Sequence, residues 1–329
     1  MPDTEERSSV VARLGLACAV LRAGQVNVAQ HQLTELADET RYGGFDDVER
    51  ATLLAALVDC RLARGELAEA DALSDPLAPL ARLGGAAGAI ATFSMAELAA
   101  VLDDPEHAIA LYLAAGERAA GHDVPPDIAP WRAGAVLTMV RTGRRDVQEL
   151  ALDHHQEALG SGSPYAVSMA LRTLATANAD GRRLALLREA RAALDGVVAA
   201  RLAAQIDTDI AGLLMLSHDP GNEAEAVRLL RSAELYAGRQ ELWPLRSRIE
   251  RLLERLGMKP RPVQSEAVAT LTQAERRVAE LAADGLTNRL IAERLEVSIK
   301  AVEWHLSRVY RKLGIQSRRG LVPTLGATA

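Results

Sequence analysis

The sequence contains few aromatic residues, few lysines and few cysteines for a chain of 329 residues. Only 3% of the residues are aromatic although 49% are hydrophobic, so the apolar share is mostly Ala, Leu and Val. Because small and straight-chain side chains favour helices that pack closely, this mixture predicts an all-α fold and not an aromatic-rich sandwich. The length suffices for two or three domains with a sizeable core.

The scarcity of cysteine excludes a disulfide framework. The two cysteines, Cys18 and Cys60, are separated by a spacing that matches no metal motif, and reduced thiols indicate the cytoplasm. The start MPDTEERSS is acidic and polar, unlike a signal peptide, and every long apolar run is interrupted by a charge or a turn signal. We therefore expect a cytoplasmic protein without a membrane span.

Several catalytic and ligand-binding motifs are missing. No Gly-Lys pair exists, so the phosphate-binding loop GxxxxGK[ST] is absent, and neither GxSxG nor HExxH occurs. His154 and His155 are adjacent in sequence and would point to different faces of a helix, and no Cys or His cluster joins them. We interpret them as part of a solvated helix face. We expect no enzymatic activity, no cofactor and no metal.

Charge is distributed unevenly along a chain whose net charge is −6. Residues 259–329 contain 12 Lys and Arg against 7 Asp and Glu, a net charge of +5. Residues 1–258 contain 26 Lys and Arg against 37 Asp and Glu, a net charge of −11. A basic tail on an acidic body indicates two different roles, of which the tail's suits an acidic partner.

The body shows a repeat of turn signals with helical stretches on both sides. The signals recur every 38 to 41 residues, at Gly24, Gly65, Asp103, Gly143, Gly181 and Gly221. An alanine lies five residues after four of the six, where a small side chain lets two helices approach closely: Ala29, Ala70, Ala108 and Ala226. This period predicts a solenoid of helical hairpins similar to tetratricopeptide arrays, and an irregular helical bundle is the alternative.

The predicted body ends with a helical stretch at 243–256, followed by MKPRPVQSE. Pro260 and Pro262 each remove a backbone donor and disfavour helix in the preceding residue. We therefore predict a helical-repeat domain at 1–257, a linker at 258–268 and a second domain at 269–329.

Three successive helix starts in the second domain carry capping residues. Thr272 with Glu275 forms a capping-box pattern, and Thr287 and Ser298 precede the next two helical stretches. The short connection between the second and third helices predicts a helix-turn-helix motif at about 288–307. Its expected core consists of Ile291, Ala292, Leu295, Val297 and Val302.

The third of these helices has two distinct faces. A buried stripe is predicted at Val302, Leu306, Val309 and Leu313, which follow helical spacing. Lys300, Trp304, Ser307 and Arg311 point away from this stripe, and Glu303 and Arg308 flank them. A tryptophan that faces outward beside basic residues is unlike a core residue.

Residues 271–318, LTQAERRVAELAADGLTNRLIAERLEVSIKAVEWHLSRVYRKLGIQSR, resemble the LuxR-type DNA-binding domain along their whole length. The matches include Thr272, Glu275, Val278, Gly285, Asn288, Ile291, Ala292, Leu295, Val302, His305, Lys312-Leu313-Gly314 and Ser317-Arg318. The body resembles the helical superhelix of large MalT-like LuxR regulators, whose ATPase module is absent here. The resemblance implies a small four-helix domain and a transcriptional regulator that binds double-stranded DNA.

The family places its base-reading side chains at positions that match Glu303, Trp304 and Ser307, and Arg308 is a further candidate beside them. Glu303 would accept a hydrogen bond from a cytosine amino group, and Trp304 would lie against a thymine methyl group or a sugar. The predicted phosphate contacts are Thr287, Asn288, Arg289, Ser298, Lys300 and Arg311. The alternatives stay open: Glu303 as a solvated charge, Trp304 as a protein contact, and the helix-start residues as caps alone.

The partners implied are double-stranded DNA and, through the repeat body, RNA polymerase or another protein. A homodimer on DNA is open, because the family's last helix would start near Ser317 and here contains Gly320, Pro323 and Gly326. The alternative function is a helical-repeat scaffold for protein binding, or a fragment of a larger LuxR-type ATPase regulator, for which DNA binding is secondary.

Overall fold

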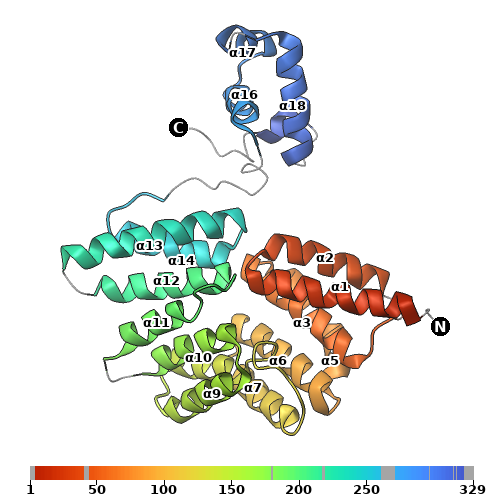
Figure 1. The fold of residues 1–329 in the computed structure, drawn as a ribbon, viewed down its shortest axis with the longest axis vertical. Coiled ribbons are helices and arrows are strands. Elements are labelled where there is room, and N and C mark those ends of the chain that lie inside the picture. Colours follow the sequence, from red (N-terminus) through yellow and green to blue (C-terminus); the bar gives the residue numbers. More distant parts are fainter. Residues whose placement is uncertain are drawn as a thin grey trace. The chain divides into compact units, whose positions relative to one another are not determined.

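The computed structural model describes residues 4–40, 44–178, 181–216, 219–260, 271–295, 297–313, 315 and 317–321. The chain divides into two compact units, Met1–Leu230 and Arg231–Ala329. Every regular element among the described residues is a helix, which confirms the all-α fold class (Figure 1).

The helices of the first unit lie in the order α1 (Thr4–Ala23), α2 (Val26–Glu39), α3 (Asp47–Arg64), α4 (Leu67–Asp71), α5 (Ser74–Ala81), α6 (Gly85–Val101), α7 (Pro105–Ala119), α8 (Trp131–Arg141), α9 (Gln148–Ser161), α10 (Pro164–Ala177), α11 (Arg183–Ala192) and α12 (Ala200–Leu214). Helix α13 (Pro220–Arg239) crosses the division. The second unit continues with α14 (Trp243–Arg255), α16 (Gln273–Ala283), α17 (Asn288–Leu295), α18 (Ile299–Leu313) and the 3-10 turn η1 (Arg318–Gly320).

Five of the six predicted turn residues adopt a left-handed backbone after a helix end. Their φ angles lie between 66° and 92°, at Gly24, Gly65, Asp103, Gly143 and Gly181. Glycine adopts this conformation readily because it has no Cβ, and a left-handed residue satisfies the last carbonyls of a helix. The sixth assignment was wrong, because Gly221 lies in the first turn of α13, where its N–H donates to Asp219 Oδ1 at 2.8 Å.

The four alanines that follow the turns are completely buried, as the hairpin argument requires. Ala29, Ala70, Ala108 and Ala226 are each 0% exposed. Consecutive helices pack against each other as α1 with α2, α6 with α7, α8 with α9 and α10 with α11. The relationship of this row to tetratricopeptide arrays stays a prediction.

The row of hairpins in the first unit curls back on itself. Helix α1 contacts α12, and Arg201 Nη2 on α12 lies 2.6 Å from Asp59 Oδ2 on α3, 142 residues earlier in the chain. The first helix of each predicted repeat lines the same cavity, which has a volume of about 280 Å3. These helices are α1, α3, α6, α8, α10 and α12. We call this space the body cavity.

The interpretation of His154 as part of a solvated face was wrong. The side chain is 1% exposed, because Ala151, His154 and Ala158 share the buried face of α9. Burial, followed by the nearby charge of Arg132, lowers the pKa of His154 to about 4. Across the described residues, no three His, Cys, Asp or Glu side chains are grouped so that they could hold a metal ion.

The predicted domain limits stay a prediction. The division between the two compact units falls inside α13, ahead of the linker predicted at 258–268, and residues 261–270 lie outside the described residues. None of the described helices combines the length and apolarity that crossing a membrane requires.

Candidate DNA-binding surface

The three helix starts in the tail are capped as predicted. Thr272 N–H donates to Glu275 Oε2 at 2.8 Å and Glu275 N–H donates to Thr272 Oγ1 at 3.3 Å, which completes the capping box. At the next two starts, Thr287 Oγ1 accepts from the N–H of Leu290 at 3.4 Å, and Ser298 Oγ accepts from the N–H of Ala301 at 3.1 Å. Local sequence therefore fixes where α16, α17 and α18 begin.

A single apolar core joins these three helices. The predicted stripe of α18 is buried, with exposures of 9% or less at Val302, Leu306, Val309 and Leu313. Ile291 and Ala292 of α17 are also buried, and Leu295 packs against them. Val297 was wrongly assigned to the core and is 43% exposed, because its N–H closes the turn onto Ala292 O while its side chain lies outside.

Glu275 has a second role that the sequence did not reveal. The side chain is 1% exposed, its Oε2 accepts from Lys312 Nζ at 2.6 Å, and its Oε1 lies 3.1 Å from Arg308 Nε. The hydrogen bond from Lys312 is the main reason that the pKa of Glu275 is lowered to about 2. One carboxylate thus caps α16 and fixes α18 against it.

Arg318 ties the segment after α18 to the turn between α16 and α17. Its guanidinium donates to Ala282 O at 3.0 Å, to Leu286 O, and to Asn288 Oδ1 at 3.3 Å. Ala282 O also accepts from the N–H of Gly285 at 3.1 Å, so Arg318 adds a further donor at the end of α16. From the sequence, Arg318 is identifiable only as a family match, because its three partners lie 30 to 36 residues earlier in the chain.

The outer face of α18 is exposed as predicted. This face comprises Lys300, Glu303, Trp304, Ser307 and Arg311, all of which are exposed. Trp304 is 54% exposed, which is unusual for a residue of its size and apolarity. The outer face of α18 therefore presents two basic groups, one carboxylate, one hydroxyl and one indole to any ligand that lies along it.

Two neighbours hold the indole of Trp304. The guanidinium of Arg308 lies 4.6 Å from the centroid of the ring, and the ring of His305 meets it edge-on at 5.0 Å between centroids. Arg308 is half-buried, and its guanidinium lies between the carboxylate of Glu275 and the indole of Trp304. Its predicted contact with a base stays a prediction, and so do those of Glu303, Trp304 and Ser307.

The predicted phosphate ligands at the helix starts have partners within the protein. The Thr287 and Ser298 hydroxyls accept the cap bonds, Asn288 Oδ1 accepts from Arg318, and Arg289 Nε lies 3.1 Å from Glu293 Oε1. A hydroxyl that accepts a cap bond still has its O–H to donate, and the Asn288 amide keeps its NH₂ donors. The phosphate contacts therefore stay predictions, and the exposed cations among them are Lys300, Arg311 and the ion-paired Arg289.

Two helices joined by a short turn, with the second helix buried along one stripe and polar along the other, define a helix-turn-helix domain. Residues 269–324 match the family described as bacterial regulatory proteins, luxR family. The chain thus carries a LuxR-family helix-turn-helix domain at its C-terminal end, as the resemblance implied.

Curated relatives match the same domain. One protein from Mycobacterium bovis and two from strains of Mycobacterium tuberculosis, all named as HTH-type transcriptional regulators, are 51% identical over 53 residues. The match covers 16% of this chain and 6% of each relative, so the relatives inform the domain and not the body. No solved structure matches the chain significantly.

Proposed function

We propose that the protein is a DNA-binding transcriptional regulator whose helix α18 reads base edges in the major groove. The supporting observation is the division of α18 into a buried stripe and an exposed polar face. The major groove admits one α-helix, and side chains of the face that enters it reach the base edges. Glu303, Trp304 and Ser307 are the residues we assign to that reading, with Arg308 at the edge of the face.

The attraction to phosphate rests on fewer cations than the sequence suggests. Glu275 neutralises Lys312 and faces Arg308, so these two side chains chiefly hold the domain together. We assign phosphate binding mainly to Lys300 and Arg311, with further contacts at the starts of α17 and α18.

The test is binding of the full chain to duplex DNA of random sequence, measured by fluorescence anisotropy across a series of salt concentrations. Affinity should fall linearly with salt on logarithmic axes, because each neutralised phosphate adds about 0.9 to the slope. The double variant Lys300→Ala/Arg311→Ala should reduce the slope by about 2. The control Arg145→Ala/Arg182→Ala removes two exposed arginines of the body and should leave the salt slope unchanged. The proposal would be contradicted if the wild type did not bind DNA at low salt. It would also be contradicted if the two double variants reduced the salt slope equally.

For the body we propose a sensor or partner-binding role, with RNA polymerase or another protein as the partner, in the cytoplasm where the chromosome lies. We propose no enzymatic activity. Deletion of the gene should change the transcription of target genes. Unchanged transcription together with a co-purifying protein would favour the scaffold alternative.

A further inference from the structure

The body cavity contains charged side chains that a simple packing defect would not have. Its volume of about 280 Å3 is close to the lower end of ligand pockets, roughly 300–1,000 Å3. Leucine, valine, phenylalanine and methionine side chains form much of the wall. Six charged residues also line it: Arg22, Asp59, Glu97, Asp127, Arg172 and Arg201. Charges withdrawn from water are costly unless each is compensated.

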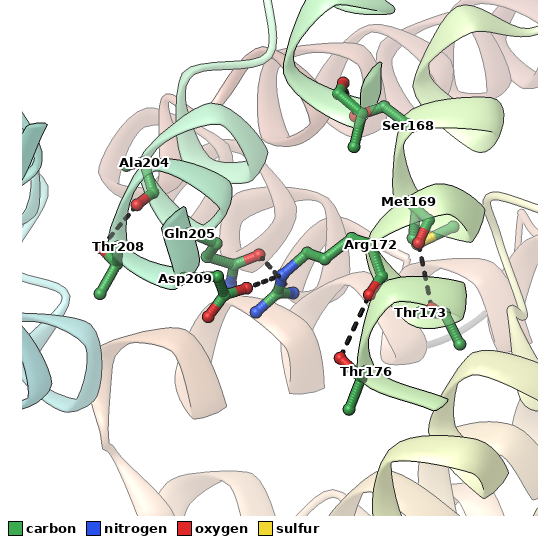
Figure 2. Close-up of polar contacts among 10 residues, drawn as sticks. Ser168, Met169, Arg172, Thr173, Thr176, Ala204, Gln205, Thr208 and Asp209 are labelled. Atoms are coloured by element: carbon green, nitrogen blue, oxygen red, sulfur yellow. Dashed lines mark hydrogen bonds and ion pairs between the residues drawn. The ribbon is translucent and has the colours of Figure 1, made fainter. Parts of the chain in front are cut away.

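Most of these charges are compensated by other protein groups. Arg22 pairs with Asp127, and Arg201 Nη2 pairs with Asp59. Figure 2 shows Arg172 reaching from α10 to α12, where its Nε lies 2.6 Å from Asp209 Oδ2 and its Nη1 lies 3.3 Å from Gln205 Oε1. Two ion pairs therefore line the cavity and a third involves one wall residue, Arg172, all without needing a ligand.

Two polar groups of the wall remain without full compensation. Glu97 accepts a hydrogen bond from the Tyr112 hydroxyl but has no cation within ion-pair distance among the described residues. Arg201 Nη1 is shielded from water and has no hydrogen-bond partner in the described part of the chain. An unsatisfied buried donor is rare in native proteins and costs stability.

The surroundings of Glu97 strengthen this observation. Burial raises the pKa of the Glu97 carboxyl and nearby Asp59 raises it further, whereas the Tyr112 hydroxyl and Arg201 lower it. Glu97 and Arg201 line the same cavity, and the positive charge of Arg201 acts on the Glu97 carboxyl. A ligand that brings a positive group to Glu97 and a negative group to Arg201 would compensate both.

The position of Glu97 is set by close packing. Tyr112, whose hydroxyl donates to Glu97, is 2% exposed and lies against Gly134 of α8. A Cβ at Gly134 would collide with the ring of Tyr112, so glycine is required for this approach. A carboxylate held by a buried tyrosine is pre-organised, which reduces the entropy lost when a ligand binds.

We propose that the body cavity binds a small zwitterion with an apolar side chain, such as an apolar α-amino acid, with its ammonium on Glu97 and its carboxylate on Nη1 of Arg201. An amine alone would leave the Arg201 donor unpaired. An acid alone would bring a second anion to Glu97. The apolar side chain would displace water from the apolar wall. That this ligand is the signal of a regulator rests on the proposed function, whereas its binding does not.

The test is isothermal titration calorimetry of the full chain with three matched probes. L-phenylalanine carries both charges, 2-phenylethylamine lacks the carboxylate and 3-phenylpropanoate lacks the ammonium. L-phenylalanine should bind at least tenfold more tightly than either analogue, because a hydrogen bond to a charged group is worth roughly a factor of ten or more. Absence of binding by L-phenylalanine, or equal binding of an analogue, would overturn the proposal without any variant.

Variants assign the two contacts. Glu97→Gln keeps an acceptor for Tyr112 and should weaken L-phenylalanine binding roughly tenfold to a hundredfold. Arg201→Lys keeps a positive charge for Asp59 but lacks the second guanidinium nitrogen. It should therefore weaken the binding of L-phenylalanine and leave the binding of 2-phenylethylamine unchanged. Glu69→Gln, on the exposed side of α4, is the control and should bind as the wild type does. Circular dichroism melting verifies that each variant folds, and wild-type affinity in a folded Glu97→Gln variant would overturn the assignment.

DNA binding is measured on the same samples. Loss of the L-phenylalanine signal with intact DNA binding would refute the ligand site alone. Intact L-phenylalanine binding without DNA binding would refute the proposed regulator function alone.

Discussion

The body and the tail place their charged side chains in opposite ways. The acidic body places several arginines and carboxylates in the wall of a cavity, where Arg201 pairs with Asp59 and Arg22 with Asp127. The basic tail exposes Lys300, Glu303 and Arg311 along the outer face of α18. A cavity of paired charges suits a small polar molecule, whereas an exposed basic face suits a large polyanion. The net charge of a segment thus says less about its ligand than the direction in which its charged side chains point.

The largest expected effect concerns acid stability of the body. His154 titrates near pH 4 in the folded chain, below its ordinary value of about 6.5, so the unfolded chain binds the proton first. Stability is therefore lost as the pH falls from about 6.5 to about 4, and the loss is about 3 kcal/mol. His154→Leu should remove that part of the pH dependence. Urea unfolding of both proteins at several pH values measures this pH dependence, and parallel pH profiles would show that His154 titrates alike in the folded and unfolded chains.

The next effect concerns Glu275, the one buried carboxylate among the described residues of the tail. Glu275→Gln keeps the capping geometry but loses the charge that holds Lys312 and Arg308, and should cost about 1.5–3 kcal/mol at neutral pH. Because the pKa of Glu275 is lowered to about 2, this stabilisation is present above about pH 4.3 and lost as the pH falls toward 2. Urea unfolding of residues 259–329, which we expect to fold alone, measures the loss. Glu280→Gln on the same helix is the control, and an equal loss there would refute the special role of Glu275.

The outer face of α18 supplies the third prediction. If Glu303 accepts from a cytosine amino group, Glu303→Gln should relax preference at one base pair by about 1–3 kcal/mol, while overall binding changes little. If Glu303 is only solvated, the same change should tighten binding to all sequences alike, because one negative charge is removed. Selection from randomised duplexes with both proteins side by side distinguishes the outcomes.

The smallest effect separates two roles of Arg289. Arg289→Ala and Glu293→Ala each break the same exposed ion pair, so each should cost only about 0.3–0.5 kcal/mol of stability. Only Arg289→Ala should also reduce the salt slope of DNA binding, by about 0.9. If the two variants have equal salt slopes of DNA binding, Arg289 forms only the ion pair with Glu293 and does not contact a phosphate.

Local signals in the sequence predicted local structure well. The caps at Thr272, Thr287 and Ser298 depend on residues three positions apart, and all three are confirmed. The stripe and outer face of α18 follow from helical spacing alone, and both are confirmed. The left-handed turns at four glycines and at Asp103 were found for the same reason, because each lies just after a helix end, whereas Gly221 lies inside α13.

Features that depend on contacts between distant elements were missed. Nothing near His154 indicates that its face of α9 is covered, and nothing near Val297 indicates that its side chain stays outside the core. Glu97 and Arg201 lie 104 positions apart, so no sequence pattern brings them to one cavity. The ion pairs of Glu275 also join two helices that only the fold brings together.

The contact between α1 and α12 has a consequence for how the body can evolve. An open array of repeats tolerates gain or loss of a unit at its ends, because each unit contacts only its neighbours. Here α1 contacts α12, and Arg201 of α12 pairs with Asp59 of α3. Duplication of one hairpin would push these surfaces apart and deletion would force them together. The number of units is therefore fixed by ring closure, and variation within this body must proceed by substitution in its walls.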